Sequence, residues 1–193
     1  MLFLSWSRPS QEDQKSCIKK SGGSFNYDDK LRGSTAKSAS VLKQDKDLAD
    51  DGFQINHSRT SVGSGVETFQ RAKIALQNWR HFSLNWAFVD PRTQIRNGSK
   101  FCVCSKVFFP WLLMPLQVTY VKDASASFSF GSGTLQGHLL AGEERFSVSM
   151  DDHNNVWYEI VSFSKPANLL SLIFYPYVLM MQKRFALESS SAM

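Results

Sequence analysis

The chain contains few cysteines, and their arrangement provides no disulfide framework. Cys17, Cys102 and Cys104 are the only three in 193 residues. Cys102 and Cys104 are separated by one residue, so an extended strand would point both side chains the same way without favouring a bond between them. Neither a Cys-x-x-Cys pair nor a His-Glu-x-x-His motif occurs, so we expect no metal site and no cofactor. A reducing, intracellular compartment follows, with the cytoplasm as the default.

A concentrated basic surface is also lacking. The net charge is +5, but the excess Lys and Arg residues are spread along the chain. The tight basic clusters are only Lys19-Lys20 and Lys183-Arg184. Proteins that bind nucleic acid concentrate these residues on one face, often beside stacking aromatic rings. We therefore expect no nucleic-acid partner.

No hydrophobic run is long enough to cross a bilayer. The most apolar segment, Ala167 to Met181, has fifteen residues and includes Pro176, whereas a membrane span needs about 20. The opening MLFLSW has no basic residues before it and is followed by polar ones, so it does not resemble a secretory signal. Two interpretations of the terminal segment remain. A kinked, buried helix is favoured, and a membrane-associated segment with Lys183 and Arg184 as interface anchors is the alternative.

Aromatic residues, in contrast, are abundant. The chain has 15 Phe, 5 Trp and 5 Tyr, which predicts a voluminous interior because each ring buries a large apolar area. The length fits one domain. Residues 1–52 are polar with isolated hydrophobic positions, and we expect a partly ordered, extended arm held by Phe25 and Tyr27. Residues 53–193 should form the folded domain.

Residue periodicity predicts the elements of that domain. Ile55 to Val62 is typical of a strand, and residues 64–67 (Ser-Gly-Val-Glu) predict a capping box that starts a helix. An apolar stripe supports the helix: Phe69, Ala72, Leu76 and Trp79. From residue 85 to 163, short β-branched and aromatic runs between turn residues predict about six strands. The sequence DDHNN at 151–155 is typical of a hairpin turn, and Ser164-Lys165-Pro166 predicts the start of the last helix.

The resulting order is strand, helix, six strands and a long terminal helix. This order indicates an α+β helix-grip fold of the START-like kind, in which a curved antiparallel sheet of about six to seven strands packs on a long C-terminal helix. Such a fold can enclose a cavity between the sheet and that helix.

Three segments also resemble a known family. VGSGVETFQRAKIALQNWRHF, SGTLQGHLLAGEERFSV and VWYEIVSFSKPA are similar to plant members of uncharacterised protein family 0548. The resemblance covers roughly residues 25–190. It implies membership of the START-like, birch-pollen-allergen-like superfamily, and it implies no particular reaction.

The segment GSGTLQGHLLAGEERF, residues 131–146, is the densest cluster of potential chemistry. A dinucleotide loop would need a helix after its glycines, but strand-like EERFSVSM follows, which favours a glycine-rich bend entering a strand. On that strand Glu144 shares a face with Phe146 and Val148. A carboxyl group there needs a hydrogen-bond donor or keeps its proton. His138 is one candidate donor, and an arginine or a tyrosine is another. The favoured interpretation is a buried polar pair, and a ligand-facing group or a general acid-base pair are the alternatives.

The following strand alternates in the same way, but its register is open. Trp157 and Glu159 share one face with Val161, while Tyr158 and Ile160 lie on the other, and either face can be the inner one. The candidate ligand-binding residues are His138, Glu144, Trp157, Glu159, Thr134 and Tyr158.

The sequence therefore favours a non-enzymatic module that binds a hydrophobic small molecule or a lipid between the sheet and the C-terminal helix. One alternative is a cyclase- or hydratase-like enzyme in which His138 and Glu144 move protons at a carbonyl compound. The other is a peripheral membrane protein attached through residues 167–187, at a plastid or other organelle envelope. The oligomeric state is left open.

Overall fold

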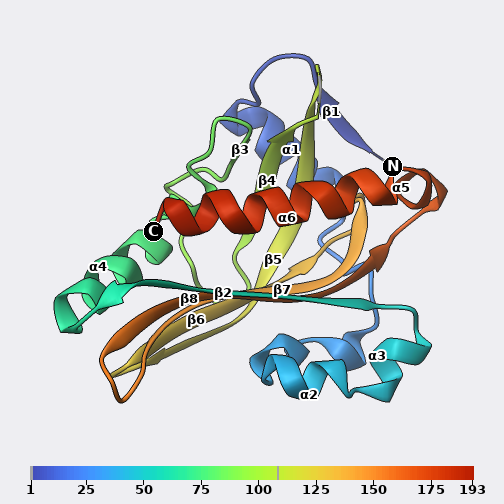
Figure 1. The fold of residues 1–193 in the computed structure, drawn as a ribbon. Helices are drawn as coiled ribbons and strands as arrows, with labels where there is room; N and C mark the ends of the chain where they lie inside the picture. The colour runs from blue at the N-terminus through green and yellow to red at the C-terminus, as the bar shows by residue number, and fades with distance from the viewer. Residues whose placement is uncertain (1, 108) are drawn as a thin grey trace.

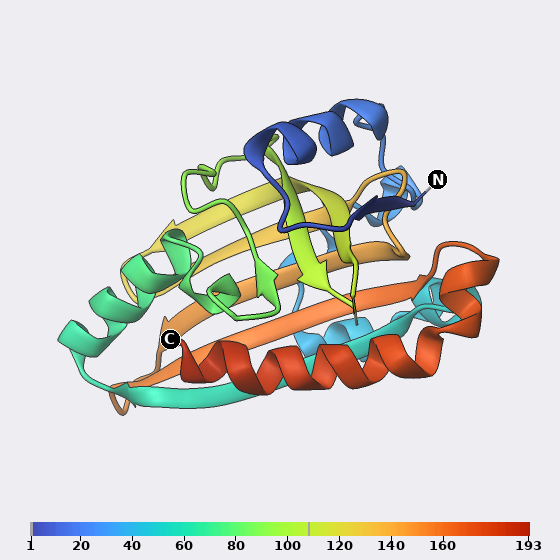
Figure 2. The same ribbon diagram turned by 90° about the horizontal axis from the view of Figure 1, so that it is seen from above.

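The protein is a curved antiparallel sheet that holds a long C-terminal helix across its concave face (Figures 1 and 2). The computed structural model describes residues 2–107 and 109–193. Seven strands follow the order β2-β8-β7-β6-β5-β4-β3, and the short β1 pairs with β5. The strands are β1 Phe3–Ser5, β2 Gln54–Ser64, β3 Ala87–Phe88, β4 Lys100–Lys106, β5 Trp111–Ala124, β6 Ser127–Thr134, β7 Leu140–Met150 and β8 Asn155–Pro166. The helix-grip prediction is confirmed.

Helices lie on both sides of this sheet. Helix α6 crosses the concave side, α4 covers one end of the sheet, and α2 and α3 lie against the opposite face (Figure 1). The α-helices are α1 Gln11–Lys20, α2 Ala39–Lys43, α3 Lys46–Asp50, α4 Val66–Gln77, α5 Leu169–Ile173 and α6 Tyr175–Ser191. Three short 3-10 turns are η1 Asp29–Leu31, η2 Ser34–Ala36 and η3 Arg80–Phe82.

The six strands predicted between residues 85 and 163 are all present, as β3 to β8. The hairpin between β7 and β8 is confirmed as well. The Asp151 side chain accepts hydrogen bonds from the backbone N–H groups of His153 and Asn155, and Asn154 adopts a left-handed conformation with φ 62°. Strand β1 was not predicted, because three residues are too few to show an alternating pattern.

The predicted helix after β2 is confirmed, but its capping box is wrong. Helix α4 begins at Val66, and its N-cap is Gly65, which has no side chain to offer. Ser64 instead pairs with Asn155 as the last residue of β2. Strand β2 therefore continues two residues beyond its predicted end, and Ser64, which was expected to cap the helix, pairs within the sheet instead.

The N-terminal segment differs from the expected extended arm. Residues 10–52 form α1, α2, α3 and the turns η1 and η2. Leu31, Leu42 and Leu48 are buried, whereas Val41 is exposed. One cluster on the outer face of the sheet contains Leu31, Ala39, Leu42, Leu48, Phe53, Val161 and Phe163. Each short helix buries only one or two residues, so no helical stripe is visible in the sequence. We call residues 10–52 the arm below.

The C-terminal segment also differs from expectation. Strand β8 continues through Pro166, and the helical part breaks at Phe174 into α5 and α6. Pro176 lies in the first turn of α6, where a missing N–H costs little. The segment is not buried, since Leu169, Leu172 and Ile173 are exposed. A cavity, rather than packed side chains, lies beneath it.

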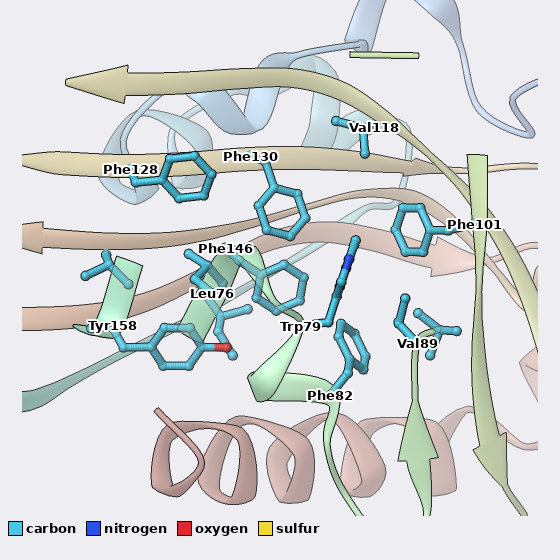
Figure 3. Close-up of a cluster of buried hydrophobic side chains, with 14 of the residues drawn as sticks. Leu76, Trp79, Phe82, Val89, Phe101, Val118, Phe128, Phe130, Phe146 and Tyr158 are labelled. Atoms are coloured by element: carbon cyan, nitrogen blue, oxygen red, sulfur yellow. The ribbon is translucent and has the colours of Figure 1, made fainter. Parts of the chain in front are cut away.

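The concave side is divided between a packed region and this cavity. Near α4, the rings of Trp79, Phe82, Phe130 and Phe146 fill the space between the sheet and the helices (Figure 3). The Trp79 ring centroid is 4.8 Å from that of Phe101 and 5.3 Å from that of Phe130. The aromatic surplus of the sequence is used here. The cavity lies toward α5, where these rings end.

Candidate functional site

A cavity of about 900 Å³ lies between the inner face of the sheet and helices α5 and α6. Its lining comes mainly from β2, β4, β5, β7 and β8 on one side and from the two helices on the other. Most of the lining side chains are aliphatic or aromatic, including Val103, Leu112, Met114, Ile160, Phe174 and Met181. The volume and the apolar lining are typical of sites for small apolar ligands.

Glu144 is the one carboxylic acid among the lining residues. The alternation of β7 places it on the inner face, since Phe146 and Val148 on the same face are buried in the aromatic core. Within residues 2–107 and 109–193 the Glu144 carboxyl group has no hydrogen-bond partner. Burial raises the pKa of this carboxyl from 4.5 to about 7. Protein surrounds the group, and the accessible part of its surface faces the cavity.

His138 also lines the cavity, at the connection between β6 and β7. Its Nδ1 lies 2.9 Å from the backbone N of Leu140 and 3.0 Å from its carbonyl O. One tautomer accepts from the N–H and the other donates to the carbonyl, so the ring is held by Leu140 in either case. Burial lowers the pKa of His138 from 6.5 to about 4, so the ring is neutral near pH 7.

The structure does not bring His138 and Glu144 together as a polar pair. His138 is fixed at Leu140, and Glu144 lies four residues further along β7. At about 3.3 Å per residue, this separation is about 13 Å along the strand. The predicted buried pair is therefore absent among the described residues, and so is the geometry of a general acid-base pair. Closeness in the sequence was misleading because β7 already begins at Leu140, so extended backbone separates the two side chains.

Trp157 and Glu159 do not line the cavity, which corrects their expected position. Glu159 accepts hydrogen bonds from Arg145 Nη2 at 2.7 Å and pairs with His57 Nε2 at 2.8 Å. The Arg59 guanidinium lies 4.2 Å from the centre of the Trp157 ring. In the observed register Glu159 pairs with Ser147, and this places Trp157 and Glu159 on the outer face. The alternation of residues in the sequence could not decide between the two faces.

Thr134 and Tyr158 are buried close to the cavity but are not among its lining residues. The Thr134 hydroxyl accepts from the Gly142 N–H at 2.9 Å and lies 2.5 Å from Asn26 Oδ1, so it ties β6 to β7 and to the arm. The Tyr158 hydroxyl donates to Ser189 Oγ at 3.4 Å and joins β8 to α6. Both residues have structural partners.

The sequence reasoning missed Glu143, the most buried acid of the described residues. Its carboxylate accepts from the backbone N–H groups of Gly33 at 2.8 Å and Thr35 at 3.0 Å. The Thr35 hydroxyl donates at 2.5 Å and the Tyr27 hydroxyl at 3.2 Å. These donors all belong to the arm, so Glu143 fastens the arm to the outer face. The sequence signal was the Glu143-Glu144 dipeptide, whose two side chains must point to opposite faces.

The glycine-rich stretch that precedes these acids was expected to be a bend, but Gly131 and Gly133 lie in β6 and Gly142 lies in β7. Gly137 lies in the connection between the two strands, and no helix follows. Gly142 is required in β7 because a Cβ atom would collide with the backbone carbonyl of Phe163 on β8. The phosphate-loop geometry is therefore absent from this stretch. In the described part of the chain, no group of three or more His, Cys, Asp or Glu residues is placed to hold a metal ion.

Comparison with known proteins gives the family. The model of the family described as "Domain of unknown function (DUF1990)" matches residues 37–192. A UPF0548 protein of Arabidopsis thaliana is 54% identical over 198 aligned residues, which cover 100% of this chain and 96% of that protein. The chain belongs to the UPF0548 family. A second member, from Dictyostelium discoideum, is 34% identical over 73% of this chain and 71% of its own length.

Solved structures support the fold of this UPF0548 chain. The crystal structure of a hypothetical protein, jhp0584, from Helicobacter pylori is similar with a TM-score of 0.50 at 14% identity. The match covers 72% of this chain and 86% of that one. At this identity the similarity shows the fold alone. The plant-type resemblance of this UPF0548 protein is confirmed by the Arabidopsis relative. The helix-grip architecture expected from its sequence is confirmed by the antiparallel sheet and the long C-terminal helix.

Proposed function

We propose that the protein binds a hydrophobic small molecule or a lipid in the cavity beneath α5 and α6. The observation that carries this proposal is the apolar, roughly 900 Å³ cavity in a protein otherwise packed with aromatic rings. Leaving such a volume empty forfeits contacts that a filled core would provide. A bound apolar molecule supplies those contacts.

A cavity-filling substitution tests this proposal. Val178 lines the cavity from α6, and Val178→Trp should weaken binding of an uncharged fluorescent apolar probe such as Nile red at least about tenfold. Met180→Trp is the matched control, because Met180 is on the same helix but exposed and outside the lining. Native mass spectrometry before and after delipidation provides a second readout. Equal probe binding by both variants, together with no co-purifying apolar species, would contradict the proposal.

A second candidate function, attachment to a membrane surface, is favoured by the exposed apolar residues of α5. Leu169, Leu172 and Ile173 are exposed, and the adjoining Leu170 and Phe174 are both exposed and part of the cavity lining. No charged residue occurs between Lys165 and Lys183. An apolar helix flanked by cationic residues is suited to bind an anionic bilayer surface. Attachment through α5 would place the cavity next to the lipid. Among the described residues, no helix is long and apolar enough to span a membrane.

Vesicle flotation tests this second function. The full chain should float with vesicles of phosphatidylcholine and phosphatidylglycerol, and Leu172→Glu with Ile173→Glu should abolish flotation while leaving the cavity intact. Val66→Glu with Ile74→Glu is the matched control, since both residues are exposed apolar positions on α4. Flotation that is unchanged by the α5 substitutions, or no flotation of the wild type, would rule this function out.

A further inference from the structure

The apolar cavity contains a row of polar side chains whose hydrogen-bonding capacity is largely unused. The row runs perpendicular to the strands, from β7 across β8 to β2. Glu144 on β7 pairs in register with Ser162 on β8, and Ser162 pairs with Asn56 on β2. Directly paired residues share one face of an antiparallel sheet at Cβ distances of about 5 Å. We call Glu144, Ser162, Asn56 and the facing Gln182 of α6 the polar row.

All four members of the polar row line the cavity. Asn56 Nδ2 donates to Gln182 Oε1 at 3.5 Å, the long end of a hydrogen bond, so the row bridges the sheet and α6. Neither the Ser162 hydroxyl nor the Glu144 carboxyl group has a partner among the described residues. Both residues line the cavity, so these polar groups are open to a molecule inside it. A ligand that brings a matching polar group would find its hydrogen-bonding partners there.

The charges around the polar row indicate what kind of group fits. The titratable residues that line the cavity with Glu144 are His57, His138, Tyr177 and Lys183. The His57 imidazole pairs with Glu159 on the outer face, and the His138 ring is hydrogen-bonded to the backbone of Leu140. Lys183 is exposed to solvent.

A further polar group lies near Glu144. The Tyr158 hydroxyl lies close enough for the Glu144 charge to raise its pKa, and it donates its hydrogen bond to Ser189. No cation is therefore paired with Glu144 in the described chain.

We propose that the ligand is an amphiphile with a hydroxyl or amine group at one end, and that this donor group binds the Glu144 carboxyl group within the polar row. This inference rests on the proposed binding function. The apolar body of the ligand would occupy the space lined by Met114, Ile160 and Met181. A ligand ending in a carboxylate is disfavoured, because it would place a second negative charge beside Glu144 in a medium of low dielectric constant.

Three chain-matched probes test the proposal on the wild-type protein: decylamine, decanol and decanoate. At pH 8 the amine should bind at least about tenfold more tightly than decanoate, with decanol between them, because a hydrogen bond to a charged group is the stronger kind. Between pH 8 and pH 5, Glu144 takes up its proton. The preference for the amine should then shrink. Displacement of a fluorescent apolar probe measures each affinity.

Substitutions locate the preference. Glu144→Gln should abolish the preference for decylamine over decanol while leaving decanol bound, because an unpaired ammonium group is costly to bury. Ser162→Ala should weaken decanol and decylamine but not decanoate. Glu67→Gln is the matched control, because it removes the same charge from an exposed residue of α4.

Each outcome decides a separate point. If decanoate binds as tightly as decylamine to the wild type, the inference about the polar row is wrong while the cavity proposal stands. The same holds if Glu144→Gln leaves the order unchanged. If no probe binds and Val178→Trp has no effect on any ligand, the proposed function itself fails. Should Glu144→Gln not fold, the wild-type order of the three probes and its pH profile still decide the question.

Discussion

At the scale of single residues, two neighbouring acids show how position alone sets chemistry. Glu143 and Glu144 are adjacent on β7 and therefore face opposite sides of the sheet. Glu143 accepts four hydrogen bonds from the arm. Glu144 faces the cavity, has no hydrogen-bond partner among the residues that the structure describes, and has a pKa raised to about 7. A buried carboxyl group whose oxygens accept hydrogen bonds from the protein stabilises the fold. A carboxyl group without such donors remains available to bind a ligand.

His81 is a second buried group without hydrogen-bond partners in the described part of the chain, and it leads to a stability prediction. Neither ring nitrogen is hydrogen-bonded there, and the ring packs on Phe146 at 4.5 Å and stacks on Trp79 at 5.6 Å. His81→Phe should raise the free energy of unfolding by about 1–3 kcal/mol, since an unsatisfied buried polar group costs about that much. Urea unfolding at pH 7 measures the change. A destabilised variant would show that shape complementarity outweighs the desolvation of the imidazole.

The advantage of His81→Phe should increase in acid. Burial lowers the pKa of His81 from 6.5 to about 3 in the folded protein. A lowered folded-state pKa means that the neutral ring's contribution is present above pH 6.5 and is lost as the pH falls toward 3. The phenylalanine variant has no such loss. The difference in unfolding free energy between variant and wild type should therefore grow from pH 7 to pH 4, and a constant difference would contradict this assignment.

At the scale of elements, the β7–β8 hairpin shows a local sequence signal that was fully predictive. The turn DDHNN was identified from residues that tolerate left-handed backbone and bond their own chain. Asp151 accepts bonds from two backbone N–H groups, and its side chain also binds the Trp157 ring N–H at 2.9 Å. All of these interactions lie within six residues, so no distant part of the protein was needed to predict them.

A substitution at the left-handed position of this hairpin should separate backbone strain from side-chain effects. Asn154 has φ 62°, a conformation that costs most residues other than glycine about 1–2 kcal/mol. Asn154→Ala should lower the free energy of unfolding by about 1 kcal/mol, whereas Asn154→Gly should leave it unchanged or raise it. Chemical denaturation of both variants provides the comparison. Equal losses in the two would assign the role to the asparagine side chain.

Longer elements were less predictable where two compete for the same residues. Ser64 was expected to cap α4, but it ends β2, and Pro166 was expected to begin a helix, but it ends β8. In both places the strand is longer than its apolar run. Hydrogen bonding to a neighbouring strand extends a strand past the residues that prefer that conformation, and this neighbour is distant in sequence.

At the scale of the whole molecule, the arm covers the outer face of the sheet. Its buried residues pack on Val161 and Phe163 of β8, and its turn at Gly33 to Thr35 supplies N–H donors to Glu143. Arg145 extends the attachment through hydrogen bonds to the carbonyl groups of Thr35 and Lys37 at 2.8 and 2.9 Å. The sheet is therefore buried on both faces, and the arm is an integral layer of the fold.

Weakening the hydrogen bonds between Glu143 and the arm should detach the arm before the rest of the protein unfolds. Glu143→Gln replaces one of the two acceptor oxygens by an amide NH₂, which faces donors and leaves some of them unpaired. We expect trypsin to cut at Lys30, Arg32 and Lys37 at least about tenfold faster in this variant, with a loss of about 2 kcal/mol in unfolding free energy. Glu67→Gln provides the control. Unchanged cleavage would show that the apolar contacts alone hold the arm.

The sequence by itself determined the order of the elements from β2 to β8, the helix stripe of α4 and the opposite orientations of Glu143 and Glu144, because these follow from periodicity along the chain. The family followed from the resemblance of three segments to known members. Only the tertiary structure decided which face of β8 is the inner one. Trp157 and Glu159 share a face with the buried Val161 and Phe163, so both faces of β8 contain apolar residues and the pattern could not choose between them. The arm covers one face, and the cavity with its polar row lies against the other. That difference arises from which segments pack on each face, and packing between segments distant in sequence leaves no local signal.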